Sequence, residues 1–200
     1  MARSVDYFLA IQSPWTYLGH ARLSSLLQAN GAQVRVRPID LGQVFPISGG
    51  LPLPKRAPQR QAYRLVELAR WSDHLKLALN LHPKFFPVPG DAASRLVIAV
   101  TRQDGEDAAM KLTGALLAAV WAQERNINDE ATLSALLTQC ALDARRLEQS
   151  QQPEVQQAYE AHTKAAIDAS VFGSPSYVVD GEIFWGQDRL DFLERRLRSA

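Results

Sequence analysis

The first forty residues hold a strand, a helix and a second strand in direct succession, and this order limits the possible folds most. Residues 5–11 (VDYFLAI) are apolar and predict a buried strand, while residues 33–40 (QVRVRPID) alternate with period two. Between them Ser13 can cap a helix with Pro14 at its first position, and Asn30-Gly31 ends that helix. Two strands joined by one helix over so short a segment are expected to pair in parallel, with a right-handed connection.

The middle of the chain is predicted to be almost entirely helical. Residues 46–58 are dense in Pro and Gly and are expected to be irregular, as is the proline-broken loop 81–89. The other segments follow helical spacing and predict helices over 59–81 (with Tyr63, Val66, Leu68 and Leu75 toward the core), 91–102, 106–125, 129–140 and 153–170, with a short piece near Asp143.

Strands return at the end of the chain. Residues 176–186 (SYVVDGEIFWG) predict two strands joined by Asp180-Gly181, a dipeptide typical of two-residue hairpin turns, and a last helix follows over 189–198. The order βαβ, helices, ββα predicts an α/β protein with a thioredoxin-like fold and a large all-helical insertion. We expect residues 1–44 and 168–200 to form the thioredoxin-like domain and residues 45–167 to form the insertion.

Composition argues against several classes of function. The 200 residues have a net charge of +1, so no global basic field would recruit nucleic acid. No apolar run is long enough to span a membrane, and residues 5–11 do not read as a signal peptide. Cys140 is the single cysteine, which rules out an internal disulfide and CxxC chemistry. We therefore expect a cytoplasmic protein without nucleic-acid or membrane partners.

The four histidines give no sign of a metal site or of a catalytic base. His74, His82 and His162 have no partners at metal-ligand spacing, so no metal is expected. His20 lies two helical turns after Ser13, too far to deprotonate it, and no GxSxG motif indicates a serine hydrolase. All four are predicted to be surface or loop residues, with His82 the one of functional interest.

The predicted fold brings the two ends of the chain together at a possible thiol-binding site. The start of the first helix meets the loop before the third strand, which here is Gly-Ser-Pro, with Pro175 expected to be cis and the backbone of Ser174 free to pair with an extended peptide. A helix N-terminus favours an anion and would push a bound thiol toward thiolate. Ser13 could donate a hydrogen bond to that thiolate, and glutathione is the expected thiol peptide. The alternative is that Ser13 only caps the helix.

Three segments resemble the 2-hydroxychromene-2-carboxylate isomerase family, whose relatives are kappa-class glutathione transferases and DsbA-type proteins. They are SPWTYLG after the first strand, IDL after the second, and FGSPSYVVDGEIFWGQDRLDFLE at the end. The resemblance spans essentially the whole chain. It implies that Ser13 is the catalytic serine that contacts the glutathione sulfur, and that the main chain of Ser174, before Pro175, binds the cysteinyl part. It also implies a segment that holds the γ-glutamyl end, formed by Trp185, Gly186, Gln187 and Asp188.

The substrate half of the resemblance departs from the family pattern. Phe45 stands in place of a lysine, Pro54 and Lys55 align with an asparagine-arginine pair, and Phe86 replaces an aromatic hydroxyl. Lys55 and Arg56 could supply other anchors for a carboxylate. The candidate substrate-binding residues are Trp15, Phe45, Lys55, Arg56, His82 and Phe86.

The resemblance implies a homodimeric, glutathione-dependent isomerase that acts on an aromatic or unsaturated keto acid in aromatic-compound breakdown. In the family, glutathione adds to the substrate, a bond rotates and glutathione leaves, which interconverts a cyclic hemiketal acid and an open aryl-idene pyruvate. Two alternatives remain open: a kappa-like glutathione transferase, and a non-catalytic module that binds glutathione or a peptide. A disulfide oxidoreductase is disfavoured because neither Ser13 nor Thr16 can form a disulfide.

Overall fold

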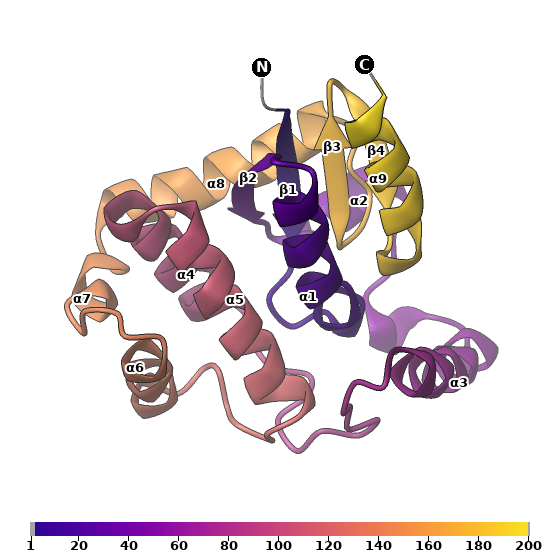
Figure 1. Cartoon of the computed structure of the whole chain (residues 1–200). Coiled ribbons are helices and arrows are strands. Elements are labelled where there is room, and N and C mark those ends of the chain that lie inside the picture. Colours follow the sequence, from indigo (N-terminus) through magenta and orange to yellow (C-terminus); the bar gives the residue numbers. More distant parts are fainter. Residues whose placement is uncertain (1–2, 200) are drawn as a thin grey trace.

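A mixed sheet assembled from both ends of the chain organises the computed structural model, which describes residues 3–199 (Figure 1). Its strands are β1 (Ser4–Leu9), β2 (Gln33–Pro38), β3 (Ser176–Val179) and β4 (Glu182–Trp185), in the order β2-β1-β3-β4. β1 pairs in parallel with β2 and antiparallel with β3, and β3 and β4 form the expected hairpin. The thioredoxin-like α/β fold predicted from the element order is confirmed.

Helices cover both faces of this sheet. They are α1 (Pro14–Ala29), α2 (Leu41–Ser48), α3 (Pro58–Leu75), α4 (Asp91–Asp104), α5 (Glu106–Trp121), α6 (Glu130–Gln139), α7 (Arg146–Gln149), α8 (Pro153–Asp168) and α9 (Leu190–Arg198), with 3₁₀ turns at Leu53–Lys55 and Gln187–Arg189. In Figure 1, α1 and α9 lie over one face and α8 runs behind the sheet, while α3 projects to one side near the start of α1. No helix within residues 3–199 combines the length and apolarity needed to cross a membrane.

One hydrophobic core continues from the sheet into the helical segment. Tyr7 and Leu9 of β1 belong to the same buried cluster as Leu96 of α4 and Leu116 and Trp121 of α5. Phe8, which points to the opposite face of β1, packs instead in a smaller cluster with residues of α2 and α8. Because alternate residues of β1 serve two cores, the sheet is buried on both sides.

Helix α2 corrects the expectation that residues 46–58 are wholly irregular. It continues through Pro46 to Ser48, and Leu53–Lys55 forms a 3₁₀ turn. The Asp40 side chain caps α2, Val44 anchors it in the core, and Gly49 ends it with a φ of 75°. A proline in such a short helix removes only one internal hydrogen bond, so burial of Val44 and the two caps outweigh that loss.

Helix α3 is shorter and less buried than its sequence predicts. It ends at Leu75 rather than residue 81, because Lys76 adopts a left-handed conformation and Leu77 N–H returns to Ser72 O at 3.0 Å. Leu68 is buried as expected, whereas Tyr63 and Val66 are 58% and 44% exposed. The prediction that these two residues face the core was wrong, since α3 packs along only one side. Helix α5 likewise ends early, at Trp121 rather than residue 125.

Strand β2 forms one edge of the sheet, and its outer side carries few free donors. Gln33 N–H bonds to Arg3 O and Ile39 N–H to Leu9 O, so the odd-numbered residues face β1. The even-numbered residues therefore face outward. Of these, Val36 N–H donates to the Glu106 carboxylate at 2.9 Å, and Pro38 has no N–H to offer.

His20 is buried in α1 and His162 is half-buried in α8, which overturns the expectation that all four histidines lie on the surface or in loops. His20 is 8% exposed within α1, where Nε2 lies 2.9 Å from Met110 O and Nδ1 lies 3.3 Å from Tyr7 Oη. His162 is half-buried in α8, and its Nδ1 has no hydrogen-bond partner among the described residues. Burial lowers the pKa of each imidazole to about 4, from an ordinary value of 6.5. Packing between distant elements determines this burial, and helical spacing alone does not reveal it.

We predict that acid destabilises the fold through these histidines. The unfolded chain takes up protons near pH 6.5 and the folded chain only near pH 4, so the free energy of unfolding should fall as pH drops between these values and level off below. For His20 alone the loss should be on the order of 1–3 kcal/mol. His20→Gln should flatten this slope in denaturant melts recorded at pH 7, 6, 5 and 4, with His74→Gln, at an exposed position, as the control. An unchanged slope in His20→Gln would show that His20 titrates normally.

Candidate functional site

Ser13 caps α1 at the point where β1 leaves the sheet. Its Oγ accepts a hydrogen bond from Thr16 N–H at 3.3 Å, and Pro14 occupies the first helical position. The same hydroxyl points its hydrogen toward Ser174 O, at a distance of 3.5 Å. That contact is long for a hydroxyl donor, so the hydrogen can be redirected to a better acceptor. Ser13 is 8% exposed.

Ser174 locks the turn before β3 against the start of α1. Its Oγ accepts from Ala10 N–H at 2.8 Å and lies 2.9 Å from Thr16 Oγ1, and all three groups are buried. The side chain of Ser174 is therefore fully engaged inside the protein. Sequence analysis did not assign Thr16 a role, although its position one turn into the helix could have suggested it.

The main chain of Ser174 is left open by this arrangement, in the sense that its N–H and C=O have no strong hydrogen-bond partner among the described residues. The Ser174-Pro175 bond is cis, as predicted, and Pro175 O accepts from Gly186 N–H at 2.9 Å. Ser174 precedes β3, and within residues 3–199 its own N–H has no backbone acceptor. A free N–H and a weakly bonded carbonyl on one residue can pair with an extended peptide.

Close contacts fix the turn between β4 and α9. Trp185 is 51% exposed and packs edge-on against Phe172, while its indole lies over Gly173, where a Cβ would fall 2.4 Å from Trp185 Nε1. Gly186 has a φ of 103°, and a Cβ there would meet Asp188 Oδ1 at 2.5 Å. Any other residue at position 173 or 186 would therefore displace Trp185 or Asp188.

Gln187 and Asp188 differ sharply in what they can offer a ligand. Gln187 is 2% exposed, and both its main-chain O and its side-chain Oε1 accept from Arg22 Nη1, at 3.0 and 3.1 Å. Its side chain positions the turn and is not free for a ligand. Asp188 is exposed, and its Oδ2 accepts from Arg189 Nη1 at 2.8 Å. A ligand ammonium would compete with Arg189 for this carboxylate.

The six candidate substrate-binding residues do not form one cluster in the structure. Phe86 packs against Trp121 with ring centroids 4.8 Å apart, and Arg56 Nε donates to Leu51 O at 2.8 Å. The other four are distributed over separate elements, with no hydrogen bond or ring contact joining them to the two serines within the described residues: Trp15 is half-buried in α1, Phe45 is half-buried in α2, and Lys55 and His82 are exposed.

Arg64 of α3 had no role predicted from the sequence, yet it lies against one of these residues, Phe86, and against Trp121. Its guanidinium carbon is 5.3 Å from the centroid of the Phe86 ring and 5.7 Å from that of Trp121. Desolvation by burial, and then the charge of Arg56, lower the pKa of Arg64 to about 10. No sequence signal could have identified it, because nothing in the helix pattern reveals which arginine is left without an acid.

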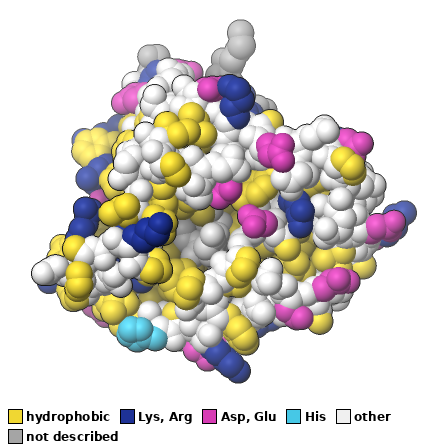
Figure 2. Space-filling model, turned by 180° about the vertical axis from the view of Figure 1, so that it is seen from behind, with side chains coloured by type: hydrophobic (Ala, Val, Ile, Leu, Met, Phe, Trp, Pro, Cys, Tyr) yellow, Lys and Arg dark blue, Asp and Glu magenta, His cyan; other side chains and the backbone are white. Residues whose placement is uncertain are grey.

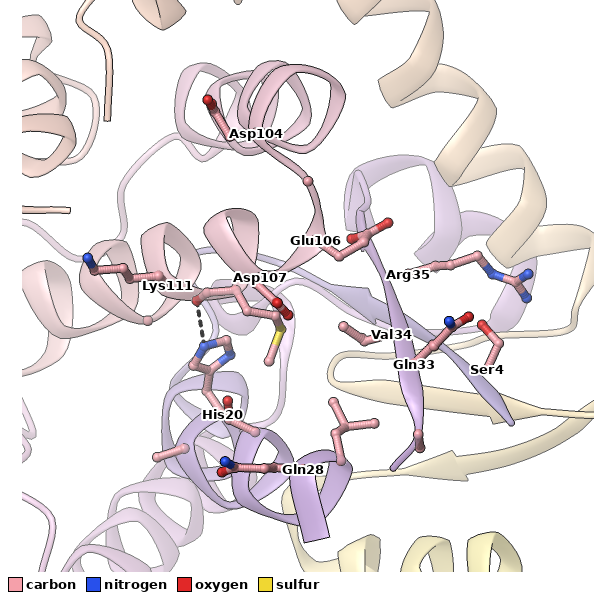
Figure 3. Close-up of a pocket in the computed structure, with 17 residues that line it drawn as sticks. Ser4, His20, Gln28, Gln33, Val34, Arg35, Asp104, Glu106, Asp107 and Lys111 are labelled. Atoms are coloured by element: carbon pink, nitrogen blue, oxygen red, sulfur yellow. Dashed lines mark hydrogen bonds between the residues drawn. The ribbon is translucent and has the colours of Figure 1, made fainter. Parts of the chain in front are cut away.

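A separate groove of about 1240 Å³ lies between α1, β2 and the start of α5, and none of the predicted site residues line it. Figure 3 shows His20 at its base and charged side chains of both signs around it, among them Arg35, Glu106 and Lys111. Glu106 is already bonded to Val36 N–H, and burial raises its pKa. The groove is thus separate from Ser13 and Ser174, around which the predicted chemistry is centred.

The arrangement around Ser13 can hold an anion or a thiolate without a metal ligand set. Among residues 3–199, no three His, Cys, Asp or Glu side chains are grouped as a metal site requires. The start of α1 instead offers a hydroxyl, the N–H of Trp15, for which no acceptor is recorded within residues 3–199, and the positive end of the helix dipole.

Comparison with known proteins places this geometry in a family. The DSBA-like thioredoxin domain family matches residues 4–198. A 2-hydroxychromene-2-carboxylate isomerase of Pseudomonas putida is 30% identical over 95% of this chain and 92% of its own. The human glutathione S-transferase kappa 1 is 23% identical over 98% of this chain and 92% of its own.

A solved structure agrees with these sequence matches. A selenomethionine 2-hydroxychromene-2-carboxylate isomerase superposes with a TM-score of 0.79 at 26% identity, covering 97% of this chain and 94% of its own. The similarity therefore extends over both the sheet and the helical segment. The chain belongs to the 2-hydroxychromene-2-carboxylate isomerase family of DSBA-like thioredoxin-fold proteins.

Proposed function

We propose that this protein is a glutathione-dependent isomerase that acts on an aromatic or unsaturated keto acid. The observation that carries the proposal is the pairing of Ser13, at the N-terminus of α1, with the open main chain of Ser174. The names of the relatives support an isomerase or a glutathione-related enzyme. The breakdown of aromatic compounds and the homodimer stay predictions of the resemblance, and the cytoplasmic location stays a prediction of the composition.

The open backbone of Ser174 fits a tripeptide thiol. Its N–H and C=O would pair with the cysteinyl residue of glutathione as a short added strand, which brings the thiol toward Ser13. The start of the 3₁₀ turn at Gln187–Arg189 would receive the γ-glutamyl carboxylate, and Asp188 its ammonium. When bound, glutathione supplies a thiolate nucleophile that is regenerated in each turnover.

Ser13 and the N-terminus of α1 would hold that sulfur as an anion. The Ser13 hydroxyl turns from Ser174 O, 3.5 Å away, to donate to the sulfur, while Thr16 N–H remains bonded to Ser13 Oγ and fixes its position. A standing hydrogen bond and the helix dipole both favour the ionised form of a thiol. Because serine has no redox chemistry, the site can bind a thiol without forming a disulfide with it.

We predict that Ser13→Ala leaves glutathione bound but raises the pKa of its thiol in the complex. When the ultraviolet absorbance of the thiolate is titrated against pH, the midpoint of the titration should move to higher pH. Turnover at neutral pH should fall by at most about 10²–10³-fold, because helix N–H groups remain.

Asp129→Ala is the matched control, since Asp129 caps α6 through Thr132 N–H as Ser13 caps α1. Each variant should lose about 1 kcal/mol of stability with its cap. Only Ser13→Ala should change the thiol titration. Equal stability losses with no change in titration or rate would make Ser13 a helix cap alone. If Ser13→Ala raises the thiol pKa as expected, but glutathione is consumed in each turnover, the kappa-like transferase would be favoured.

We predict that Asp188→Ala weakens glutathione binding by about 0.5–1.5 kcal/mol, as expected for one exposed polar contact that already has a competing partner. Asp191→Ala, on the first turn of α9, is the control, because this exposed carboxylate lies on the same segment. Calorimetric titration with glutathione and a thermal melt separate the two roles of Asp188. A lower melting temperature with unchanged affinity would mean that Asp188 only stabilises the turn.

A further inference from the structure

Arg64 is a half-buried cation for which residues 3–199 supply no acceptor. Its Nη2 is buried without a hydrogen-bond partner among the described residues, and the structure records no ion pair for it within residues 3–199. Trp121, which lies against the guanidinium, is fully buried, and its Nε1 also has no acceptor in the described part of the chain. Two neighbouring donors without an acceptor are unusual, because buried polar groups are nearly always paired.

The residues around Arg64 increase the excess of positive charge and of unpaired donors there. Burial lowers the pKa of both Arg64 and Arg56, and neighbouring positive charges lower each further: Arg56 acts on Arg64, and Arg60 on Arg56. Lys55 adds a further positive charge on the preceding 3₁₀ turn. On α3 itself, Glu67 is paired with Arg70. Stacking of Arg64 on Phe86 and Trp121 accounts for part of its stability, but cation–π contacts leave the N–H groups of the guanidinium unbonded.

This cluster lies next to the start of α1. α3 packs against α1, and Tyr17, one turn after Ser13, donates to Ala78 O at 2.6 Å in the segment that follows α3. The loop that carries Phe86 continues to Gly90, where a Cβ would lie 2.4 Å from Gln12 Oε1, directly before Ser13. On the back of the molecule, Figure 2 shows a hollow with hydrophobic side chains in its walls and charged side chains of both signs near its rim, beside the lobe that contains α3.

We propose that Arg64, with Arg56 beside it, binds the carboxylate of the aromatic or conjugated keto acid on which this enzyme acts. The inference rests on the proposed function and assigns the recognition of the acid to residues of this chain. A guanidinium beside the packed rings of Phe86 and Trp121 suits a ligand that carries a carboxylate on a flat unsaturated body. The glycyl carboxylate of glutathione is a worse match, because that peptide has no aromatic part to lie along the half-buried ring of Phe86.

The test compares benzylidenepyruvate, an aromatic unsaturated keto acid, with benzylideneacetone, which lacks the carboxylate. Binding of each is measured by calorimetry, alone and with S-methylglutathione, whose blocked thiol prevents reaction. The wild type should bind the acid more tightly than the ketone. Arg64→Met should lose about 10- to 100-fold in affinity for the acid, as for one charge-assisted contact, and keep its affinity for the ketone.

Two further variants sharpen the result. Arg64→Lys keeps the charge without the planar fork and should fall between the wild type and Arg64→Met. It also provides the test if Arg64→Met fails to fold in a thermal melt. Arg102→Met, at an exposed position on α4, should bind both compounds as the wild type does.

Several outcomes would overturn the proposal. One is a wild type that binds the acid and the ketone equally well. Another is an Arg64→Met variant that loses the same affinity for the acid as for the ketone. A third is an Arg64→Met variant that loses affinity for glutathione, which would assign Arg64 to the peptide. A wild type that fails to bind glutathione would instead contradict the proposed function. In that case the titrations without S-methylglutathione would still decide whether Arg64 binds the carboxylate.

Discussion

The hydroxyl of Ser174 is the group on which the geometry of the site depends. It joins Ala10 N–H, at the end of β1, to Thr16, in the first turn of α1, across more than 150 residues of sequence, with distances of 2.8 and 2.9 Å. Without it, a buried N–H would lose its acceptor, which costs about 1–3 kcal/mol. The same contact holds the main chain of Ser174 opposite Ser13. Thus one side chain, itself unavailable to a ligand, determines where the open backbone and the helix N-terminus meet.

The two halves of the site differ in chemical character because they come from different parts of the fold. At the sheet, short polar side chains and a backbone turn are tied together by buried hydrogen bonds. In the helical segment, Arg64 lies against the rings of Phe86 and Trp121, and α3 is only partly buried. In the function proposed above, the first half would bind the peptide thiol and the second half the flat, anionic substrate.

Local rules explain what could be predicted from the sequence. Alternation predicted the strands, and Ser13-Pro14 predicted the start of α1. Asp180-Gly181 predicted the hairpin, in which both residues have positive φ. Each of these signals acts within a few residues. The roles suggested for the site residues came from the resemblance to a family and not from such rules.

The features that could not be predicted depend on contacts between distant elements. Pro46 is tolerated in α2 because Val44 is buried, and Tyr63 is exposed because α3 packs along one side only. His20 and His162 are internal because of the helices and strands packed over them. Arg64 lacks a hydrogen-bond acceptor among the described residues because of how three elements pack together: α3, the loop with Phe86, and the end of α5.

The outer side of β2 has a consequence for how copies of this chain can associate. Sheets grow across molecules when an edge strand presents a row of free N–H and C=O groups. Here the Glu106 carboxylate occupies the N–H of Val36, and Pro38 removes the next donor in the outward-facing row. A second strand would therefore find an interrupted ladder and would have to displace a half-buried carboxylate. Joining of sheets through β2 is disfavoured, and contacts between copies would have to use the helical surfaces or the opposite edge.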